Sequence, residues 1–328
     1  GDLTSWAKKF SALDQAKVQS LSNKARSLDR VLQSIIIFFD THSSVDELFT
    51  RWILNFNPEK QTLTIGPMYG DFLFEKFMNK CAEKAVFLSA TLGSKEAFCR
   101  ELGVKPEELF FVEVDTPFPP EKSPVVSIPV LQMSYSNIDK TIAENLGRAI
   151  DEIMNSHPNQ KGIIHSSTYK VQTEIFKRVS KSNQDRLLCR DMVIIREGHE
   201  HASPKMKSAY LLNNLQLLAK HEADESPTVL LSPSMMEGVD LADDLSSFQI
   251  IVKLPWANLG DIRVKRKSEI DPAWYQNKMW CNVMQACGRS TRHENDESIT
   301  YILDASFGKF YKMWTKNLPV WFRKRIIT

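Results

Sequence analysis

The chain has 328 residues, of which 42% are hydrophobic and 25% charged, and its 42 basic and 40 acidic side chains leave a net charge of +2. This composition is ordinary for a globular protein and excludes a uniformly basic surface. A nucleic-acid binder of this kind must therefore gather its basic residues locally. The length predicts two units, each with a core of its own.

No apolar run approaches the roughly 20 residues that span a bilayer, and the N-terminus has no signal-peptide pattern. We therefore expect no membrane partner and a cytoplasmic or nucleoid-associated location, or a nuclear one in a eukaryote. The five cysteines form no CxxC pair, which predicts free thiols in a reducing compartment and neither a zinc nor an iron–sulfur site. They are Cys81, Cys99, Cys189, Cys281 and Cys287.

The first 40 residues are helical in pattern, because apolar side chains recur at spacings of three and four over residues 3–40. Asn23 marks either a break between two helices or a point inside one long helix. Two short β-like runs follow, Phe49–Phe56 and Gln61–Pro67. The segment Asn57–Lys60 between them is typical of a hairpin turn.

The next segment alternates between helix and strand patterns. Asp71–Cys81 is predicted to be a helix, and the apolar run Ala85–Leu88 a buried strand. Ser94–Leu102 has the pattern of a second helix, with Gly103 as its C-cap. Four prolines then fall within residues 115–124. They disfavour both helix and strand, so we place a domain boundary there.

Strand and helix patterns alternate regularly after this boundary, which predicts βαβ units and a parallel sheet. Ligands of such sheets bind at the carboxyl ends of the strands. The predicted strands are Val125–Val130, Gly162–His165, Val229–Ser232, Phe248–Val252 and Ile299–Leu303. The predicted helices are Ile138–Met154, Val171–Ser180 and Trp274–Cys287.

Two arginines follow the last of these helices in the segment Gln285–Arg292. Arg289 and Arg292 are three residues apart, which predicts that they lie on one helical face. Both could then reach the same phosphate, which the planar guanidinium binds through two parallel hydrogen bonds. The same residues also suit an ordinary basic helix end, which the helix dipole stabilises.

A second polar segment, Ser232–Leu241, follows the apolar strand Val229–Leu231. Its serine hydroxyls and backbone N–H groups can hold a nucleic-acid phosphate. Glu237 and Asp240 repel phosphate, so they suit orienting other groups or binding ribose or water. The alternative is a capped turn in which Ser234 or Asp240 is an N-cap.

Two more hydroxyl-rich segments follow strands. Ser89-Ala90-Thr91 comes directly after Ala85–Leu88, where small residues let a loop approach a neighbouring domain. Thr91 or Ser94 could equally cap the next helix. Ser166–Tyr169 follows Gly162–His165 and offers donors to a phosphate backbone, or caps for a helix.

The order and spacing of these four segments resemble the XPD/DinG branch of superfamily 2 DNA helicases over roughly residues 45–328. In that resemblance Ser89-Ala90-Thr91 is similar to motif III and Ser166–Tyr169 to motif IV. Ser234–Asp240, with its Glu-Gly-x-Asp core, is similar to motif V. Gln285–Arg292, reading QxxGRxxR, is similar to motif VI. Three further similar stretches are Asp115–Pro120, Lys253–Trp256 and Leu318-Pro319.

The departures from this family are at least as informative. The 328 residues contain no GxxxxGK(S/T) phosphate loop, no DEAH or DEAD box and none of the family's iron–sulfur cysteines. All of these precede motif III in the family order, so we expect a truncated chain. Asp296-Glu297 replaces the usual Asp-Gly after motif VI, and Ser306 stands where the family often has arginine, which puts the local geometry there in doubt.

The resemblance implies an α/β fold with a RecA-like parallel sheet domain, helicase domain 2, and a partial RecA-like domain 1 with the remnant of a helical insertion. The implied divisions are 1–44 for the helical remnant of the arch insertion, 45–122 for the distal part of domain 1 with motif III, and 123–328 for domain 2 with motifs IV, V and VI.

The resemblance also assigns roles to individual residues. Those implied in catalysis are Gln285, Arg289 and Arg292. Those implied in coupling nucleotide state to movement are Ser89, Ala90, Thr91, Glu237, Gly238, Asp240 and Gly288. Those implied in DNA binding are Ser166, Ser167, Tyr169, Ser234 and Lys253.

The implied function is the C-terminal motor portion of an ATP-dependent DNA helicase that moves 5′ to 3′ on single strands. The parent enzyme would use ATP and Mg²⁺, with ATP shared between this chain and a missing N-terminal RecA-like domain, and would act on single-stranded or forked DNA. No metal site and no iron–sulfur cluster are expected in these residues, and the chain alone is expected to be inactive. The alternative is a non-catalytic module that binds DNA or a partner.

Overall fold

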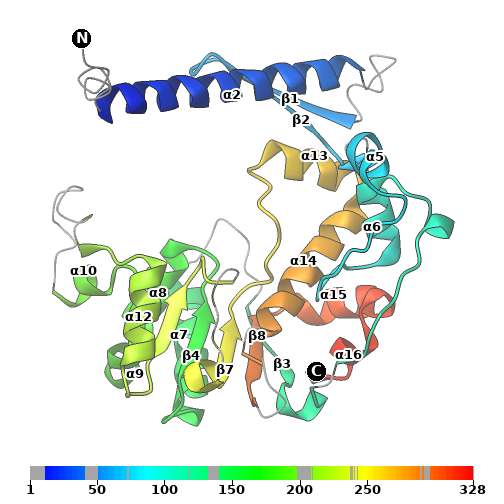
Figure 1. Ribbon diagram of the computed structural model, residues 1–328. Coiled ribbons are helices and arrows are strands. Elements are labelled where there is room, and N and C mark those ends of the chain that lie inside the picture. The colour runs from blue at the N-terminus through cyan, green and yellow to red at the C-terminus, as the bar shows by residue number, and fades with distance from the viewer. Residues whose placement is uncertain are drawn as a thin grey trace, which may run out of the picture. The chain divides into compact units, whose positions relative to one another are not determined.

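The computed structural model describes residues 12–40, 51–71, 74–116, 118–131, 140–197, 208, 210–236, 239, 241, 243–288, 290–291 and 296–327. The chain divides into two compact units, Gly1–Lys84 and Ala85–Thr328. Figure 1 shows the elements of both. In the described part of the chain, no helix is both long enough and apolar enough to cross a membrane.

The N-terminal unit contains a long helix and a hairpin. Helix α2 runs without a break from Ala12 to Asp40, so the alternative of one continuous helix through Asn23 is the one observed. Strands β1 (Trp52–Asn57) and β2 (Thr62–Pro67) pair antiparallel, which confirms the predicted hairpin. The predicted helix over Asp71–Cys81 is observed as a π-helical turn, Phe74–Met78, followed by the short α5, Asn79–Cys81.

The predicted buried strand Ala85–Leu88 is wrong. These residues form no strand, and Val86 and Leu88 are 83% and 90% exposed. A strand needs a hydrogen-bonded neighbour, and within the described residues no other strand pairs with this segment. Residues 109–114, which are apolar except for Glu113, likewise form no helix or strand, with Phe110 91% and Val114 78% exposed.

The C-terminal unit is built on the predicted parallel sheet. Seven strands lie in the order β5-β6-β4-β7-β8-β3-β9, and every neighbouring pair is parallel. Five strands coincide with predictions to within one residue at either end, and the edge strands β5 and β9 were not predicted. The strands are β3 Val125–Leu131, β4 Gly162–His165, β5 Leu187–Cys189, β6 Val229–Ser232, β7 Phe248–Ile251, β8 Ile299–Asp304 and β9 Ile326–Ile327.

Helices cover both faces of this sheet, which places one apolar core on each side (Figure 1). The helices packed into the first core include α7 Lys140–Ser156, α8 Tyr169–Arg178 and α12 Asn214–Ala223. Those packed into the second are α14 Pro272–Cys287, α15 Phe307–Trp314 and α16 Val320–Arg323. The remaining α-helices are α6 Lys95–Leu102, α9 Lys181–Arg186, α10 Met192–Arg196 and α13 Ile262–Ile270.

The segment after Lys84 belongs to the sheet unit because it is fastened to α14. The backbone N–H of Ser94 donates to Asn277 Oδ1 at 3.0 Å, and Arg100 forms a salt bridge with Asp271 at 2.8 Å. Gly93 has a φ of +80°, and a Cβ there would lie 2.3 Å from the Asn277 side chain, so only glycine fits. As predicted, α6 begins after Ser94, whose hydroxyl caps it, and ends at Gly103 in the left-handed region. The three-part division at 44 and 122 stays a prediction.

Arg186 joins several chain segments at one end of the first core. Its guanidinium donates to four carbonyl oxygens, at 2.8 to 3.0 Å, and burial lowers its pKa. These acceptors are the carbonyls of Met154, His157, Gln160 and Pro227. We expect Arg186→Met to lower the free energy of unfolding by about 3 kcal/mol, because four carbonyl oxygens, three of them partly buried, lose a charged donor. Urea denaturation measures this, with the exposed Arg148→Met as control. Equal stability of the two variants would contradict the assignment.

Candidate functional site

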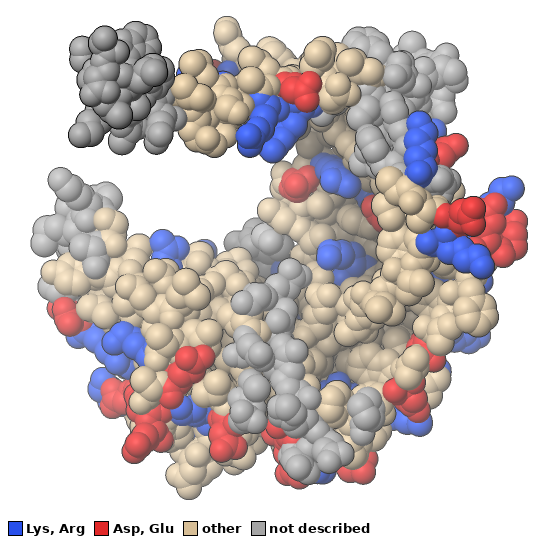
Figure 2. All heavy atoms as spheres, in the orientation of Figure 1, with Lys and Arg blue, Asp and Glu red and all other residues tan. Residues whose placement is uncertain are grey.

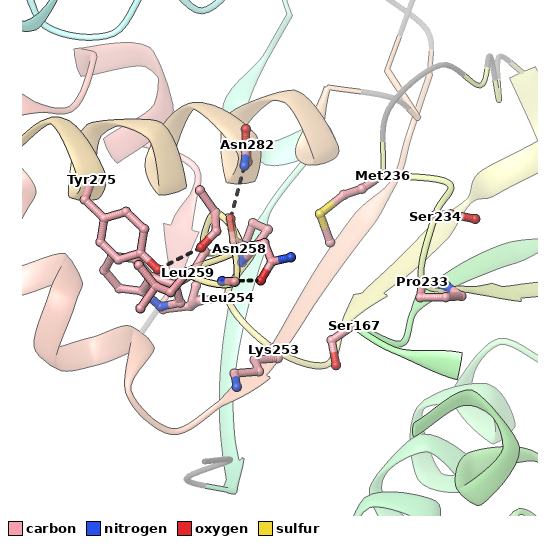
Figure 3. Close-up of a pocket in the computed structure, with 14 residues that line it drawn as sticks. Ser167, Pro233, Ser234, Met236, Lys253, Leu254, Asn258, Leu259, Tyr275 and Asn282 are labelled. Atoms are coloured by element: carbon pink, nitrogen blue, oxygen red, sulfur yellow. Dashed lines mark hydrogen bonds between the residues drawn. The ribbon is translucent and has the colours of Figure 1, made fainter. Parts of the chain in front are cut away.

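A pocket of about 680 Å³ lies at the carboxyl ends of three adjacent strands, where parallel sheets bind ligands. Ser167 follows β4, Ser234 follows β6 and Lys253 follows β7, and all three line the pocket. Figure 3 shows them on three separate loops, with Tyr275 on the opposite wall. Parallel topology thus gathers three of the five residues predicted to bind DNA.

The two serine hydroxyls of the motif IV segment differ in where they lie: that of Ser166 is buried, and that of Ser167 is at the pocket. Ser166 is fully buried and donates to the carbonyl oxygen of Thr168 at 3.4 Å, so its hydroxyl is not available at the surface. Thr168 caps α8, as the alternative interpretation proposed. Ser167 is in the left-handed region, with a φ of +65°, which is uncommon for a residue with a side chain and frequent at functional sites. Ser167 is thus the motif IV serine that reaches the pocket.

Ser234 is exposed and held by a polar neighbour. Its hydroxyl lies 3.1 Å from Asn214 Nδ2 and 3.3 Å from Ser232 Oγ. Asn214 comes from the start of α12, which sequence reasoning did not predict. Ser234 does not cap a helix, because no helix begins directly after it. Its hydroxyl is therefore oriented at the rim of the pocket.

Lys253 begins a loop that is fixed to β8. The backbone N–H of Leu254 donates to Asp304 Oδ2 at 3.0 Å, and Ser306 donates to Asp304 Oδ1 from both its N–H and its hydroxyl. Burial lowers the pKa of Lys253, and the nearby Asp304 carboxylate raises it. Ser306, a departure from the family pattern, thus helps to hold the loop that carries this cation.

The far wall of the pocket is aromatic. Trp256 stacks on Tyr275 with ring centroids 4.9 Å apart, and Phe310 meets the Trp256 ring edge-on at 5.0 Å. The Tyr275 hydroxyl donates to the carbonyl oxygen of Ala257 at 2.9 Å, which fixes the loop against α14. From the sequence, Trp256 is only the last residue of Lys253–Trp256, a stretch similar to the helicase family. Nothing in the sequence predicts its contact with Tyr275.

The segments similar to motifs III and VI are in direct contact. Gln285 Nε2 donates to Thr91 Oγ1 at 2.8 Å, and the N–H of Thr91 donates to Ser89 Oγ at 3.2 Å. Ser89, Ala90 and Thr91 line a second pocket of about 910 Å³ together with Gln285 and Gly288. Thr91, predicted to couple nucleotide state to movement, therefore shares a hydrogen bond with Gln285, predicted to act in catalysis.

Five of the predicted site residues lie outside the described residues. They are Glu237, Gly238, Asp240, Arg289 and Arg292. Helix α14 ends at Cys287, Gly288 is its C-cap, and Ser290 and Thr291 are not helical. The prediction that Arg289 and Arg292 share a helical face is therefore not supported. That the two arginines act on one phosphate rests on the motif spacing alone.

The second pocket by itself does not fit ATP with its metal ion. Glu113 and Asp115 line it and would repel a triphosphate. The hydroxyl of Thr291, another lining residue, is buried and has no hydrogen-bond partner among the described residues. Among the described residues, no three His, Cys, Asp or Glu side chains are grouped to hold a metal ion. These residues can supply at most one wall of a nucleotide site.

Basic and acidic side chains are mixed on one face of the molecule (Figure 2). On the face that Figure 2 shows, lysine and arginine side chains are interspersed with aspartate and glutamate. The first pocket itself carries three of the side chains that were predicted to bind DNA. Two of them, Ser167 and Ser234, are neutral donors, and Lys253 is a cation.

The fold has a counterpart among solved structures. A structure titled "XPD_APO" matches with a TM-score of 0.51 and 17% identity, over 78% of this chain and 51% of that one. At this identity the likeness shows the fold, which is the predicted RecA-like parallel sheet.

Sequence comparisons identify relatives and a family. An "ATP-dependent DNA helicase CHL1" from Scheffersomyces stipitis is 35% identical over 112 residues, which are 29% of this chain and 13% of that protein. The CHL1 of Debaryomyces hansenii is 27% identical over 213 residues, or 58% and 25% of the two chains. The chain thus matches a quarter or less of these relatives' length. Residues 150–325, more than half of the chain, match the family described as "Helicase C-terminal domain". The chain therefore belongs to the helicase C-terminal domain family.

Proposed function

We propose that this chain is the C-terminal motor portion of an ATP-dependent DNA helicase and that its first pocket holds single-stranded DNA. The observation that carries the proposal is the convergence of Ser167, Ser234 and Lys253, from three strand ends, on one pocket with an aromatic wall. Hydroxyl and ammonium donors suit phosphates. Aromatic rings such as Trp256 suit stacking of unpaired bases.

Motifs III and VI would form the link between DNA grip and nucleotide state. The hydrogen bond from Gln285 to Thr91 supports this role, because movement of either segment changes the other. Arg289 and Arg292 would neutralise charge on a γ-phosphoryl group held by another domain. The bound nucleotide and its Mg²⁺ would supply the phosphoryl chemistry. Movement from 5′ to 3′ and a nuclear or nucleoid location stay predictions.

The exposed apolar segments around Leu88 and Phe110 support a first RecA-like domain as a neighbour. Their apolar side chains and their lack of helix suit strands of a sheet to which another domain contributes. A module acting alone would leave these side chains in water. We therefore favour the motor portion over the non-catalytic module.

We expect the isolated chain to bind single-stranded DNA weakly and to hydrolyse no ATP, with or without DNA. These residues include neither the phosphate loop nor the carboxylate that positions Mg²⁺ in such motors. Fluorescence anisotropy with labelled oligothymidine, and a coupled ATPase assay, measure the two properties. Preference for duplex over single-stranded DNA of equal length would contradict the DNA site, and DNA-stimulated ATP turnover would contradict the division of labour.

A further inference from the structure

The edge strand β5 extends the line of strand ends beyond the first pocket. In the sheet, β5 is followed by β6, β4 and β7. Their carboxyl ends carry, in that order, Arg190, Ser234, Ser167 and Lys253. At about 4.8 Å between strands, these four ends span about 14 Å. A stacked strand of nucleic acid advances about 3.4 Å per nucleotide, so the line is long enough for several phosphates.

The Arg190 side chain lies against Tyr169 from the motif IV segment. Its guanidinium carbon is 4.7 Å from the centroid of the Tyr169 ring. This cation–π contact is the one interaction that the side chain makes with the described residues, and no carboxylate there neutralises it. Tyr169 is 43% exposed, so the pair is at the surface.

The neighbouring acid is directed elsewhere. Asp191 accepts hydrogen bonds from Gln172 Nε2 at 2.7 Å and from Thr173 Oγ1 at 2.8 Å, both on α8. Its carboxylate therefore hydrogen-bonds to side chains of α8 and not to Arg190. Arg190 is thus a cation with no carboxylate partner among the described residues. It lies over an aromatic ring at the end of a strand, in the same row of strand ends as Ser234 and Ser167.

We propose that Arg190 contacts a phosphate of the bound single strand and that Tyr169 positions its guanidinium. The proposal rests on the proposed function and extends the DNA path by one strand end, from β6 to β5. The planar fork of arginine pairs two phosphate oxygens, and stacking on a ring leaves the N–H edge of the guanidinium free to do so.

Anisotropy titration of the full chain with labelled oligothymidine, at several KCl concentrations from about 20 mM upward, tests the proposal. Arg190→Gln keeps a polar side chain that can donate a hydrogen bond and removes its charge. The slope of log affinity against log salt should become shallower by about 0.7, the value for one phosphate of a single strand. By the same relation, a loss of about 0.7 in the slope corresponds to about fivefold weaker binding at about 0.1 M salt. Arg190→Lys should keep the slope, and Tyr169→Leu should weaken binding with little change of slope.

Arg148→Gln is the matched control, since Arg148 is an exposed arginine on α7 that is bonded to Asn145. It should leave affinity and slope unchanged. No binding of oligothymidine by the wild-type chain at low salt would overturn the proposed DNA site and this inference together. Binding with an unchanged slope in Arg190→Gln would overturn the inference alone. An equal loss in Arg148→Gln would show non-specific attraction and overturn it as well.

Discussion

Replacing Arg292 by alanine, in a protein that contains both halves of the motor, is expected to lower kcat for ATP hydrolysis by about 10³-fold. An arginine finger stabilises charge that develops on the γ-phosphoryl group in the transition state. Binding of the ground-state nucleotide should change much less, because that charge is smaller before transfer begins. Steady-state ATPase assays with saturating single-stranded DNA measure kcat, and titration with a fluorescent ADP analogue measures affinity.

Two further variants sharpen this experiment. Arg292→Lys keeps the charge but loses the planar fork, so we expect partial activity. Arg148→Ala removes an exposed arginine on α7 and should leave kcat unchanged. If nucleotide affinity collapsed in Arg292→Ala while kcat held, Arg292 would be a ligand of the ground state and not a finger.

Replacing Ser234 by glutamate is expected to weaken binding of single-stranded DNA by about 100-fold at low salt. A carboxylate about 5 Å from a phosphate, at an effective dielectric constant of about 20, costs about 3 kcal/mol. Ser234 is exposed at the rim of the pocket, so the longer side chain has room and the fold should persist. Anisotropy measures the affinity, and the melting temperature reports on folding.

Ser234→Gln separates charge from size at this position. Glutamine has the shape of glutamate without its charge, so it should lose only the contact of the hydroxyl, or roughly 1 kcal/mol. The difference between the two variants should shrink as salt screens the repulsion. Equal affinities for the folded Glu and Gln variants at low salt would exclude a phosphate next to Ser234.

The sequence alone determined most of the parallel sheet and the identity of the motifs. The inner strands are short apolar runs buried on both faces, so a local pattern is enough to find them. The sequence also placed Ser167 and Ser234 after parallel strands, whose carboxyl ends meet at one edge of a sheet. The edge strands β5 and β9 were missed because three and two residues carry too little pattern.

Tertiary structure decided whatever depends on a neighbour remote in the chain. Ala85–Leu88 has the composition of a strand but forms none, because pairing needs a second strand beside it. Trp256 stacks on Tyr275 and Arg190 lies over Tyr169 because separate elements pack together. No residue spacing in the sequence predicts either contact. Local propensity therefore identified the elements and the hydroxyl donors. The aromatic wall and the additional cation required contacts that only the folded chain makes.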